Sequence, residues 1–341
     1  MTKKLIKANK LHKILFSILE QNNVREDVAI HMIEGVIQAS LRGVDSHGIR
    51  LFPHYLEGFR KGRLNKNPDY KFYKTGLATS LLNADNAPGH SAGMVGMKKA
   101  IALAKKAGIG AVAVSNSSHF GAAAYFSFAA AKEDMIGLSF THATAHVPPK
   151  NGIRPFLGNN PFCLVAPSAN ELPYCFDMAT TRTTFNNVQN YLDKNKKIPK
   201  GLALDKNGKP TEDPAKVFNL LSIGDYKGFG LSMSLEILCS LLTGMEYGPN
   251  VSAMFDGDLS KKRKIGHYFI AINIASFVDV KIFKSRIQDM MDDLRSEPNN
   301  GLGSILVPGD PEKITFKKRR DFGLKIDKKL YNLINKYFPD K

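Results

Sequence analysis

Short apolar runs alternate with longer helical patterns between residues 80 and 140, and this alternation limits the possible folds more than any other feature. Runs at 80–84, 110–115 and 135–140 predict strands, and the segments 90–106 and 121–132 predict helices. Such alternation is typical of an α/β domain, because each helix returns the chain across one face of a sheet. We therefore expect an α/β fold, with further strands at 162–166, 174–178, 267–274 and 303–307.

Helical patterns dominate both ends of the chain. Apolar residues recur at three- and four-residue spacing in 9–19 and 25–41, and the second pattern stops at Gly43. A third helix is expected at 51–60, followed by a linker from 62 to 76. Later helices are expected at 228–242, 280–295 and 327–337.

The composition is that of a globular protein without covalent cross-links. The 341 residues are 43% hydrophobic, which allows a large core and suggests about two domains. Cys163, Cys175 and Cys239 have neither CxxC nor metal-ligand spacing, so we expect buried thiols and a reduced, cytoplasmic compartment. Because no apolar run reaches about 18 residues and the basic start lacks an apolar segment, neither a membrane span nor a signal peptide is expected.

The net charge of +17 raises the question of an anionic partner. The densest basic runs, at 194–197, 261–264 and 317–320, are not interleaved with the aromatic residues on which nucleic-acid bases stack. We therefore expect no nucleic-acid partner and a general attraction for small anionic molecules. A non-catalytic protein that binds anions or nucleic acid is the alternative from another functional class.

The segment 43–50 places a hydroxyl, an imidazole and a guanidinium within five residues. His47, preceded by Ser46, titrates near neutral pH and can donate or accept a proton. Arg50 can hold a carboxylate through two parallel hydrogen bonds. A proton-transfer group beside an anion-binding group suits a 2-hydroxy or 2-oxo acid. A capped turn with a solvated histidine is the structural alternative.

Three further polar residues stand at the ends of predicted elements. His119 follows a buried strand, where open sheets bind ligands, although capping of the next helix is an alternative role. Asp177 ends an apolar strand, and a buried carboxylate needs a partner, so we expect it to bind a cofactor or orient an imidazole. Lys227 begins an apolar helix whose positive N-terminus disfavours it, so we expect it to face an anion. The turn at 308–310 can cover a ligand.

The common nucleotide and hydrolase motifs are missing. No GxGxxG follows the first strand of the α/β region and no GxxxxGK[ST] occurs, so a nicotinamide cofactor would need another scaffold. The absence of GxSxG leaves nucleophilic hydrolysis without support. His142 and His146 have the spacing of metal ligands on a helix, but two prolines follow and no third ligand is evident. We expect two loop histidines and no metal.

Six motifs carry a resemblance to one family. They are DSHG at 45–48, SNSSHFG at 115–121, FDMATT at 176–181, IPKG at 198–201, DKNGKPTEDP at 205–214 and YKGFGL at 226–231. Together, in this order, they resemble the type-2 malate/L-lactate dehydrogenases. That family also contains sulfolactate dehydrogenase, ureidoglycolate dehydrogenase, diketogulonate reductase and piperideine-carboxylate reductase. The resemblance extends over nearly the whole chain.

The resemblance implies a fold unlike the Rossmann type, which agrees with the missing dinucleotide motif. The implied class is α/β with an α+β-like mixed sheet. A helical domain at 1–75 would be completed by the C-terminal segment 280–341, and a nicotinamide-binding α/β domain would occupy 76–279. The resemblance also implies a homodimer with active sites near the subunit interface.

The resemblance also implies residue roles. His47 would be the acid/base residue, assisted by Ser46. Arg50 would hold the substrate carboxylate, and His119 would be a second active-site histidine. The residues expected to bind NAD or NADP are Asp177, Met178, Ala179, Thr180, Lys227, Gly228, Pro308, Gly309 and Asp310.

The implied reaction moves a hydride between a nicotinamide cofactor and C2 of a small 2-hydroxy or 2-oxo acid that resembles malate, lactate or sulfolactate. A cyclic imine acid or a sugar-derived keto acid is the alternative substrate.

Three segments depart from the family pattern. The family often has Pro-Phe-Gly-Gly and then Gly-Thr-Asn-Pro, where this chain has Pro-Phe-Leu at 155–157 and Gly-Asn-Asn-Pro at 158–161. The usual proline and paired glycines before the Tyr-Lys pair appear as Ser-Ile-Gly-Asp at 222–225. His142 and His146 lie in a segment expected to approach the cofactor. These departures spare the proton-transfer residues and leave the substrate and the choice between NAD and NADP open.

Overall fold

The computed structural model describes residues 5–255 and 257–339. Residues 1–4 belong to the predicted helical domain and to the basic start for which no signal peptide is expected. Residues 340–341 are the end of the predicted C-terminal part of that domain. Those positions lie outside the described residues. None of the described helices is both long and apolar enough to cross a membrane.

The described residues form helices, strands and short 3-10 turns. The α-helices are α1 (Ala8–Glu20), α2 (Glu26–Leu41), α3 (Phe52–Lys61), α4 (Gly89–Ala107), α5 (Ala124–Ala131), α6 (Phe185–Asp193), α7 (Tyr226–Glu236), α8 (Val280–Ser296), α9 (Asp310–Phe322) and α10 (Lys328–Tyr337). The strands are β1 (Leu5–Ile6), β2 (Lys71–Lys74), β3 (Thr79–Asn83), β4 (Ile109–Ser117), β5 (Met135–Thr141), β6 (Phe162–Ala166), β7 (Tyr174–Met178), β8 (Ala203–Leu204), β9 (Pro210–Thr211), β10 (Asn219–Leu220), β11 (Ile265–Asn273) and β12 (Leu324–Lys325). The 3-10 turns used below are η1 (Asp45–His47) and η2 (Ile49–Leu51), and η4 (Ile237–Leu241) is a π-helical turn that extends α7.

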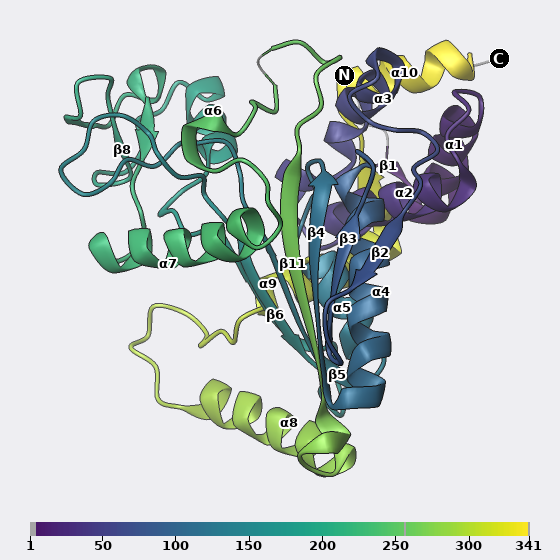
Figure 1. Cartoon of the computed structure of the whole chain (residues 1–341). Coiled ribbons are helices and arrows are strands. Elements are labelled where there is room, and N and C mark those ends of the chain that lie inside the picture. The colour runs from purple at the N-terminus through teal and green to yellow at the C-terminus, as the bar shows by residue number, and fades with distance from the viewer. Residues whose placement is uncertain (1–4, 256, 340–341) are drawn as a thin grey trace.

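A seven-stranded mixed sheet forms the centre of the molecule (Figure 1), in the order β2-β3-β4-β11-β5-β6-β7. β3 and β4 are parallel, as expected for strands joined by the crossover helix α4. β11 lies antiparallel between β4 and β5, so Phe269 is opposite Val112 on one side and Ser139 on the other. The mixed α/β fold predicted from the sequence is therefore confirmed.

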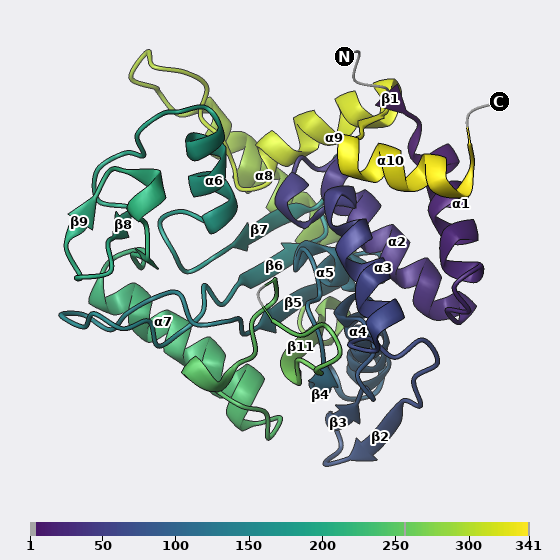
Figure 2. The same ribbon diagram turned by 90° about the horizontal axis from the view of Figure 1, so that it is seen from above.

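The first hydrophobic core lies between the sheet and the helices α4 and α5, which cover one of its faces (Figure 2). The Phe126 ring on α5 packs edge-on against the Phe269 ring on β11 at a centroid distance of 5.2 Å. A Cβ atom at Gly93 on α4 would lie 2.6 Å from Phe126, so α4 approaches this pair closely only because glycine is there.

The second hydrophobic core joins the two ends of the chain. Leu11 and Leu15 on α1 and Phe52 and Phe59 on α3 are fully or almost fully buried together with Leu330 on α10. β1 pairs with β12, which brings the first described residues beside the C-terminal helices. The division into domains at 75/76 and 279/280 stays a prediction. α8, which belongs to the predicted C-terminal helical part, lies at the opposite end of the sheet from this core (Figure 1).

Two local predictions are wrong, and the helix α9 was missed. The linker 62–76 contains β2, an exposed edge strand whose residues lack a buried face. The predicted strand at 303–307 is an unpaired loop, and its apolar residues do not enter a sheet. α9 was not predicted because ion pairs hold it instead of an apolar stripe: its only buried residues are Asp310 and Lys313.

His90, at the start of α4, lies where the two cores meet. The imidazole is fully buried, and Cβ atoms at Gly35 on α2 and Gly121 before α5 would lie within 2.4 Å of it. Gly121 also has a φ of +77°, so both its backbone conformation and its close contact with His90 require glycine there. Neither ring nitrogen of His90 has a hydrogen-bond partner in the described part of the chain. Burial lowers the pKa of His90 to about 3.

We predict that His90 makes the protein less stable in acid. Because its pKa lies below the ordinary value of 6.5 in the folded state, the unfolded chain binds one more proton between these values. Stability should therefore fall as the pH drops below about 6.5. His90→Leu should flatten this dependence by about 1.4 kcal/mol per pH unit, measured by urea unfolding between about pH 6.5 and 5. An unchanged slope would contradict the prediction.

Candidate active site

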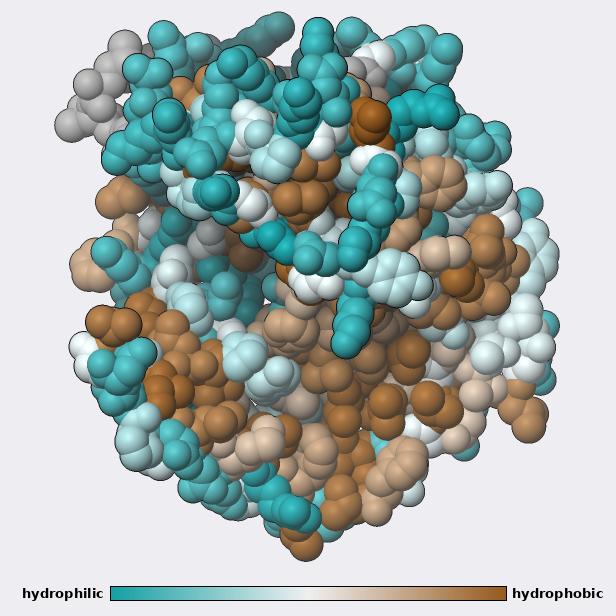
Figure 3. All heavy atoms as spheres, turned by 90° about the vertical axis from the view of Figure 1, so that its left-hand side faces the viewer, coloured by the Kyte–Doolittle hydropathy of each residue, from teal (hydrophilic) through white to brown (hydrophobic). Residues whose placement is uncertain are grey.

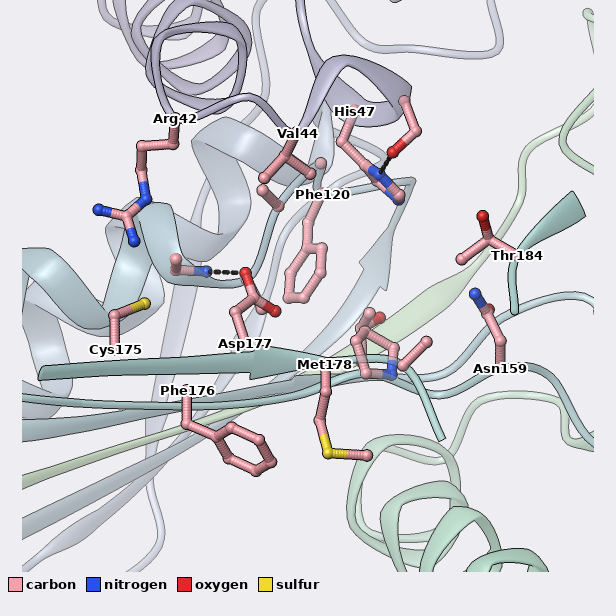
Figure 4. A pocket seen from close by; sticks show the side chains of 18 of the residues that line it. Arg42, Val44, His47, Phe120, Asn159, Cys175, Phe176, Asp177, Met178 and Thr184 are labelled. Atoms are coloured by element: carbon pink, nitrogen blue, oxygen red, sulfur yellow. Dashed lines mark hydrogen bonds between the residues drawn. The ribbon is translucent and has the colours of Figure 1, made fainter. Parts of the chain in front are cut away.

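A cavity of about 530 Å³ lies between the turn η1 and the strand β7 (Figure 4). Arg42, Val44 and His47 reach it from the helical side, and Asp177 and Met178 reach it from β7. The segment 119–124 before α5 and the segment 306–309 before α9 form further walls. Segments far apart in the sequence therefore meet here, each at the end of a regular element, as is usual for ligand sites.

Ser46 fixes the orientation of His47. The Ser46 Oγ lies 2.7 Å from the His47 Nδ1, and this hydrogen bond is drawn in Figure 4. The backbone at Gly48 cannot carry a side chain, because a Cβ there would lie 2.1 Å from the Ser40 Oγ. That same hydroxyl accepts a hydrogen bond from the Ile49 N–H. The loop therefore packs tightly on α2 and leaves the His47 Nε2 without a partner among the described residues.

A tyrosine holds the second histidine. The Tyr55 hydroxyl on α3 lies 2.7 Å from the His119 Nδ1. The rings of His47 and His119 are stacked at a centroid distance of 5.4 Å. The His119 Nε2 also has no partner among the described residues. The cavity thus has two adjacent imidazoles, each held through Nδ1 and open at Nε2.

Burial determines the protonation of both imidazoles. It lowers the pKa of His47 to about 4, with a further contribution from the positive charge of Arg50. It also lowers the pKa of His119 well below its ordinary value, with His47 and Arg263 adding to the effect. Both rings are therefore neutral near pH 7, the form in which an imidazole can accept a proton.

Asp177 ends β7 inside the cavity. Its Oδ2 accepts a hydrogen bond of 3.0 Å from the Ala124 N–H at the start of α5. Burial raises the pKa of Asp177 to about 6, opposed by this bond and by the charge of Arg42. The Arg42 guanidinium lies 4.3 Å from the centre of the Phe128 ring. This end of the cavity thus combines a carboxylate, a buried cation and a helix N-terminus.

The cavity has the features of a nucleotide site. Its size is in the range of cofactor pockets, and its walls are mostly apolar with a few polar groups. The small side chains of Ala122 and Ala123 allow close approach to the N-terminus of α5, where an anion is favoured. Arg42 supplies a positive charge beside it. These residues fit a nicotinamide dinucleotide, and no group of metal ligands was found among the described residues.

The structure brings most of the predicted site residues together. Eight of them line the cavity: Ser46, His47, His119, Asp177, Met178, Ala179, Pro308 and Gly309. Thr180 is fully buried beside it, and the Thr180 Oγ1 lacks a hydrogen-bond partner in the described chain. Asp310 is paired with Arg295 at 2.7 Å.

Three predicted residues lie elsewhere. Arg50 is exposed and does not line the cavity. Lys227 is exposed at the start of α7, also outside the cavity lining. Gly228 follows it and packs against the Ile223 carbonyl so closely that no side chain would fit.

Four residues at this site were not singled out from the sequence. Arg42 lies just beyond the end of the predicted helix, and Tyr55 lies inside one. Arg263 belongs to a run of four basic residues that looked like an ordinary solvated stretch. Glu236 lies in a strongly apolar helix pattern, and its Oε1 is 3.4 Å from the Nδ1 of His142 in the cavity wall. Only Glu236 gives a clear signal in the sequence, as a single acid among apolar residues.

Comparison with known proteins supports the fold and the family. A malate/L-lactate dehydrogenase family model matches residues 6–335. The L-sulfolactate dehydrogenase of Methanocaldococcus jannaschii is 36% identical over 331 residues, covering 96% of this chain and 94% of that protein. The ureidoglycolate dehydrogenase (NAD(+)) of Escherichia coli strain K12 is 33% identical over 330 residues, with the same coverage.

A solved structure gives the same result. The crystal structure of malate dehydrogenase from Entamoeba histolytica matches with a TM-score of 0.92 and 32% sequence identity, covering 100% of this chain and 99% of that one. The prediction of an NAD(P)-dependent dehydrogenase is thereby confirmed at the level of the family. The chain belongs to the malate/L-lactate dehydrogenase family.

Proposed function

We propose that the protein interconverts a small 2-hydroxy acid and the corresponding 2-oxo acid, with His47 as the acid/base residue. The observation that carries the proposal is the pair of neutral, stacked imidazoles that are open at Nε2 in a mostly apolar cavity. The His47 Nε2 accepts the hydroxyl proton during oxidation and returns a proton to the oxygen during reduction. The nicotinamide, when bound, accepts or supplies the hydride at C2.

We also propose how the cofactor is held. Residues 177–179 at the end of β7, with Pro308 and Gly309, line the cavity and would contact the cofactor. Arg42 adds a positive charge that favours the phosphates of NAD or NADP. Thr180 and Asp310 support these lining residues from behind. Lys227 and Gly228 stay predicted cofactor contacts, since they follow the loop whose Ile223 N–H bonds the Thr180 carbonyl.

A homodimer is the assembly that the surface favours. Apolar side chains gather on the face of the molecule that carries α7 (Figure 3). Along α7 and η4, Met233, Ile237, Leu241 and Leu242 are each exposed by 42% or more. Exposed apolar patches of this kind are typical of subunit interfaces. We propose that a second copy of the chain covers this face.

A reducing, cytoplasmic location is consistent with the cysteines. Cys163 and Cys175 lie on the neighbouring strands β6 and β7, yet all three thiols are buried and free of disulfide bonds. Burial raises the pKa of Cys163 well above its ordinary value, which keeps the thiol protonated and unreactive. We therefore propose that these cysteines fill the core and form no disulfide.

The substrate prediction is tested with a panel of 2-oxo acids, sugar-derived keto acids and cyclic imine acids, each with NADH and NADPH. We expect loss of reduced-cofactor absorbance with at least one small 2-oxo acid such as oxaloacetate, pyruvate or sulfopyruvate. Turnover of a cyclic imine acid or a sugar-derived keto acid alone would favour the alternative substrates. No turnover of any member would contradict the proposed function.

His47→Ala should lower turnover by about a hundredfold or more, because it removes the group proposed to accept the substrate proton. Binding of the reduced cofactor, measured by its fluorescence, should survive. His31→Ala removes a histidine that lies outside the cavity, against Ser91, and serves as the matched control. Equal turnover of the His47 variant and the wild-type enzyme would refute the assignment.

Leu241→Glu should break the dimer, because it places a charge in the proposed apolar interface. Light scattering should then give the mass of one chain in place of two. Leu77→Glu changes a leucine that is 85% exposed outside this face and should leave the dimer intact. A wild-type protein that is monomeric, or a Leu241 variant that stays dimeric, would contradict the interface.

A further inference from the structure

Arg263, just before β11, is a buried cation in the wall of the cavity. Its side chain is almost fully enclosed, with the residue 6% exposed. It lines the main cavity with His47 and His119. It also lines a small adjoining void together with Tyr55 and His119. Arg263 is therefore close to both imidazoles of the site.

Two protein oxygens hold the guanidinium in place. Nε and Nη2 donate to the Ser252 carbonyl over 3.2 and 2.8 Å, and Nη2 also donates to the Thr144 Oγ1 over 3.0 Å. A guanidinium has five N–H donors, so these bonds use three of them. The two N–H groups of Nη1 have no hydrogen-bond partner in residues 5–255 and 257–339. One edge of Arg263 is thus anchored, and the other is available to a ligand.

The positive charge of Arg263 has no counter-ion within the described chain. No carboxylate there lies within ion-pair distance of it, whereas Arg295, for comparison, contacts three. Burial lowers the pKa of Arg263 to about 9, and the charge of Arg63 adds to this effect. The group is still positive near pH 7. A buried charge without a partner is costly, so such a site favours an anion that arrives with the ligand.

Arg50, the residue expected from the sequence to hold the substrate carboxylate, is placed differently. It is exposed, lies outside the cavity lining, and acts on the site through its charge on His47. We propose that Arg263 holds the carboxylate of the substrate and so selects 2-hydroxy and 2-oxo acids over uncharged analogues. This inference rests on the proposed function and names the residue that would give it its specificity.

The test compares an acid with its uncharged amide, using pyruvate and pyruvamide with saturating reduced cofactor. The wild-type enzyme should favour the acid in kcat/KM. Arg263→Met should reduce kcat/KM for the acid about a hundredfold, mainly through KM, and leave the amide nearly unchanged. Arg263→Lys should recover part of the preference, because the charge returns without the planar pair of donors. An equal reduction of kcat/KM for the acid and the amide in Arg263→Met would overturn the proposal.

Two further variants separate a role in binding from a role in structure. Arg63 is also buried, but it donates to backbone carbonyls of the segment 254–261. Any effect of Arg63→Met on kcat/KM should therefore be the same for the acid and the amide. Arg50→Met should retain the preference for the acid. A loss of preference in the Arg50 variant, with the preference intact in the Arg263 variant, would assign the carboxylate to Arg50 and overturn the proposal.

A binding measurement makes the result independent of turnover. Oxalate carries the carboxylate chemistry but cannot be reduced by the cofactor. Calorimetry should detect its binding to the wild-type protein with NADH or NADPH bound, and loss of that binding in Arg263→Met. Arg263-dependent binding without turnover of any 2-oxo acid would retain this inference while refuting the proposed function. No binding of oxalate to the wild-type protein would overturn the inference.

Discussion

The hydrogen bond between Tyr55 and His119 joins the two hydrophobic cores beside the part of the cavity that His47 and His119 line. Tyr55 belongs to the core that the chain ends build, and His119 follows β4 in the central sheet. Burial raises the pKa of the Tyr55 hydroxyl far above its ordinary value, so it stays protonated and remains a hydrogen-bond donor. The position of His119 against His47 therefore depends on how the cores pack, and the two imidazoles form a site only when both cores are folded.

The buried positive charges in the cavity wall influence the protonation of its groups and the charge of the ligands that it favours. Arg42 and Arg263 are both buried in the cavity wall, Arg42 on the side of Asp177 and Arg263 on the side of His119, whose pKa it helps to lower. Protonating His47 or His119 would add a third positive charge to an enclosed space. The same charges favour an anionic cofactor and an anionic substrate. The large positive net charge of the chain has little part in this, because exposed charges are screened by salt and buried ones are not.

Local patterns predicted much of the fold because apolar periodicity reports directly on burial. They placed His119 and Asp177 at strand ends, where the structure shows them lining the cavity. They did not predict the insertion of β11 between β4 and β5, because strand pairing depends on contacts far apart in sequence. They did not predict α9, which ion pairs stabilise. They also did not single out Arg263, because it lies in a run of basic residues and most such runs are solvated. Burial of a charge is a tertiary property that a local pattern does not encode.

The departure from the family pattern at His142 and the burial of Arg263 belong to one hydrogen-bonded layer. The His142 Nε2 accepts a hydrogen bond of 2.9 Å from the Gly266 N–H, which leaves the proton on Nδ1, facing Glu236. Gly266 and His142 thereby tie the end of β5 to the start of β11. Two residues further along from His142, Thr144 accepts from Arg263. The histidine thus acts as a structural link that fixes the segment holding the Arg263 guanidinium.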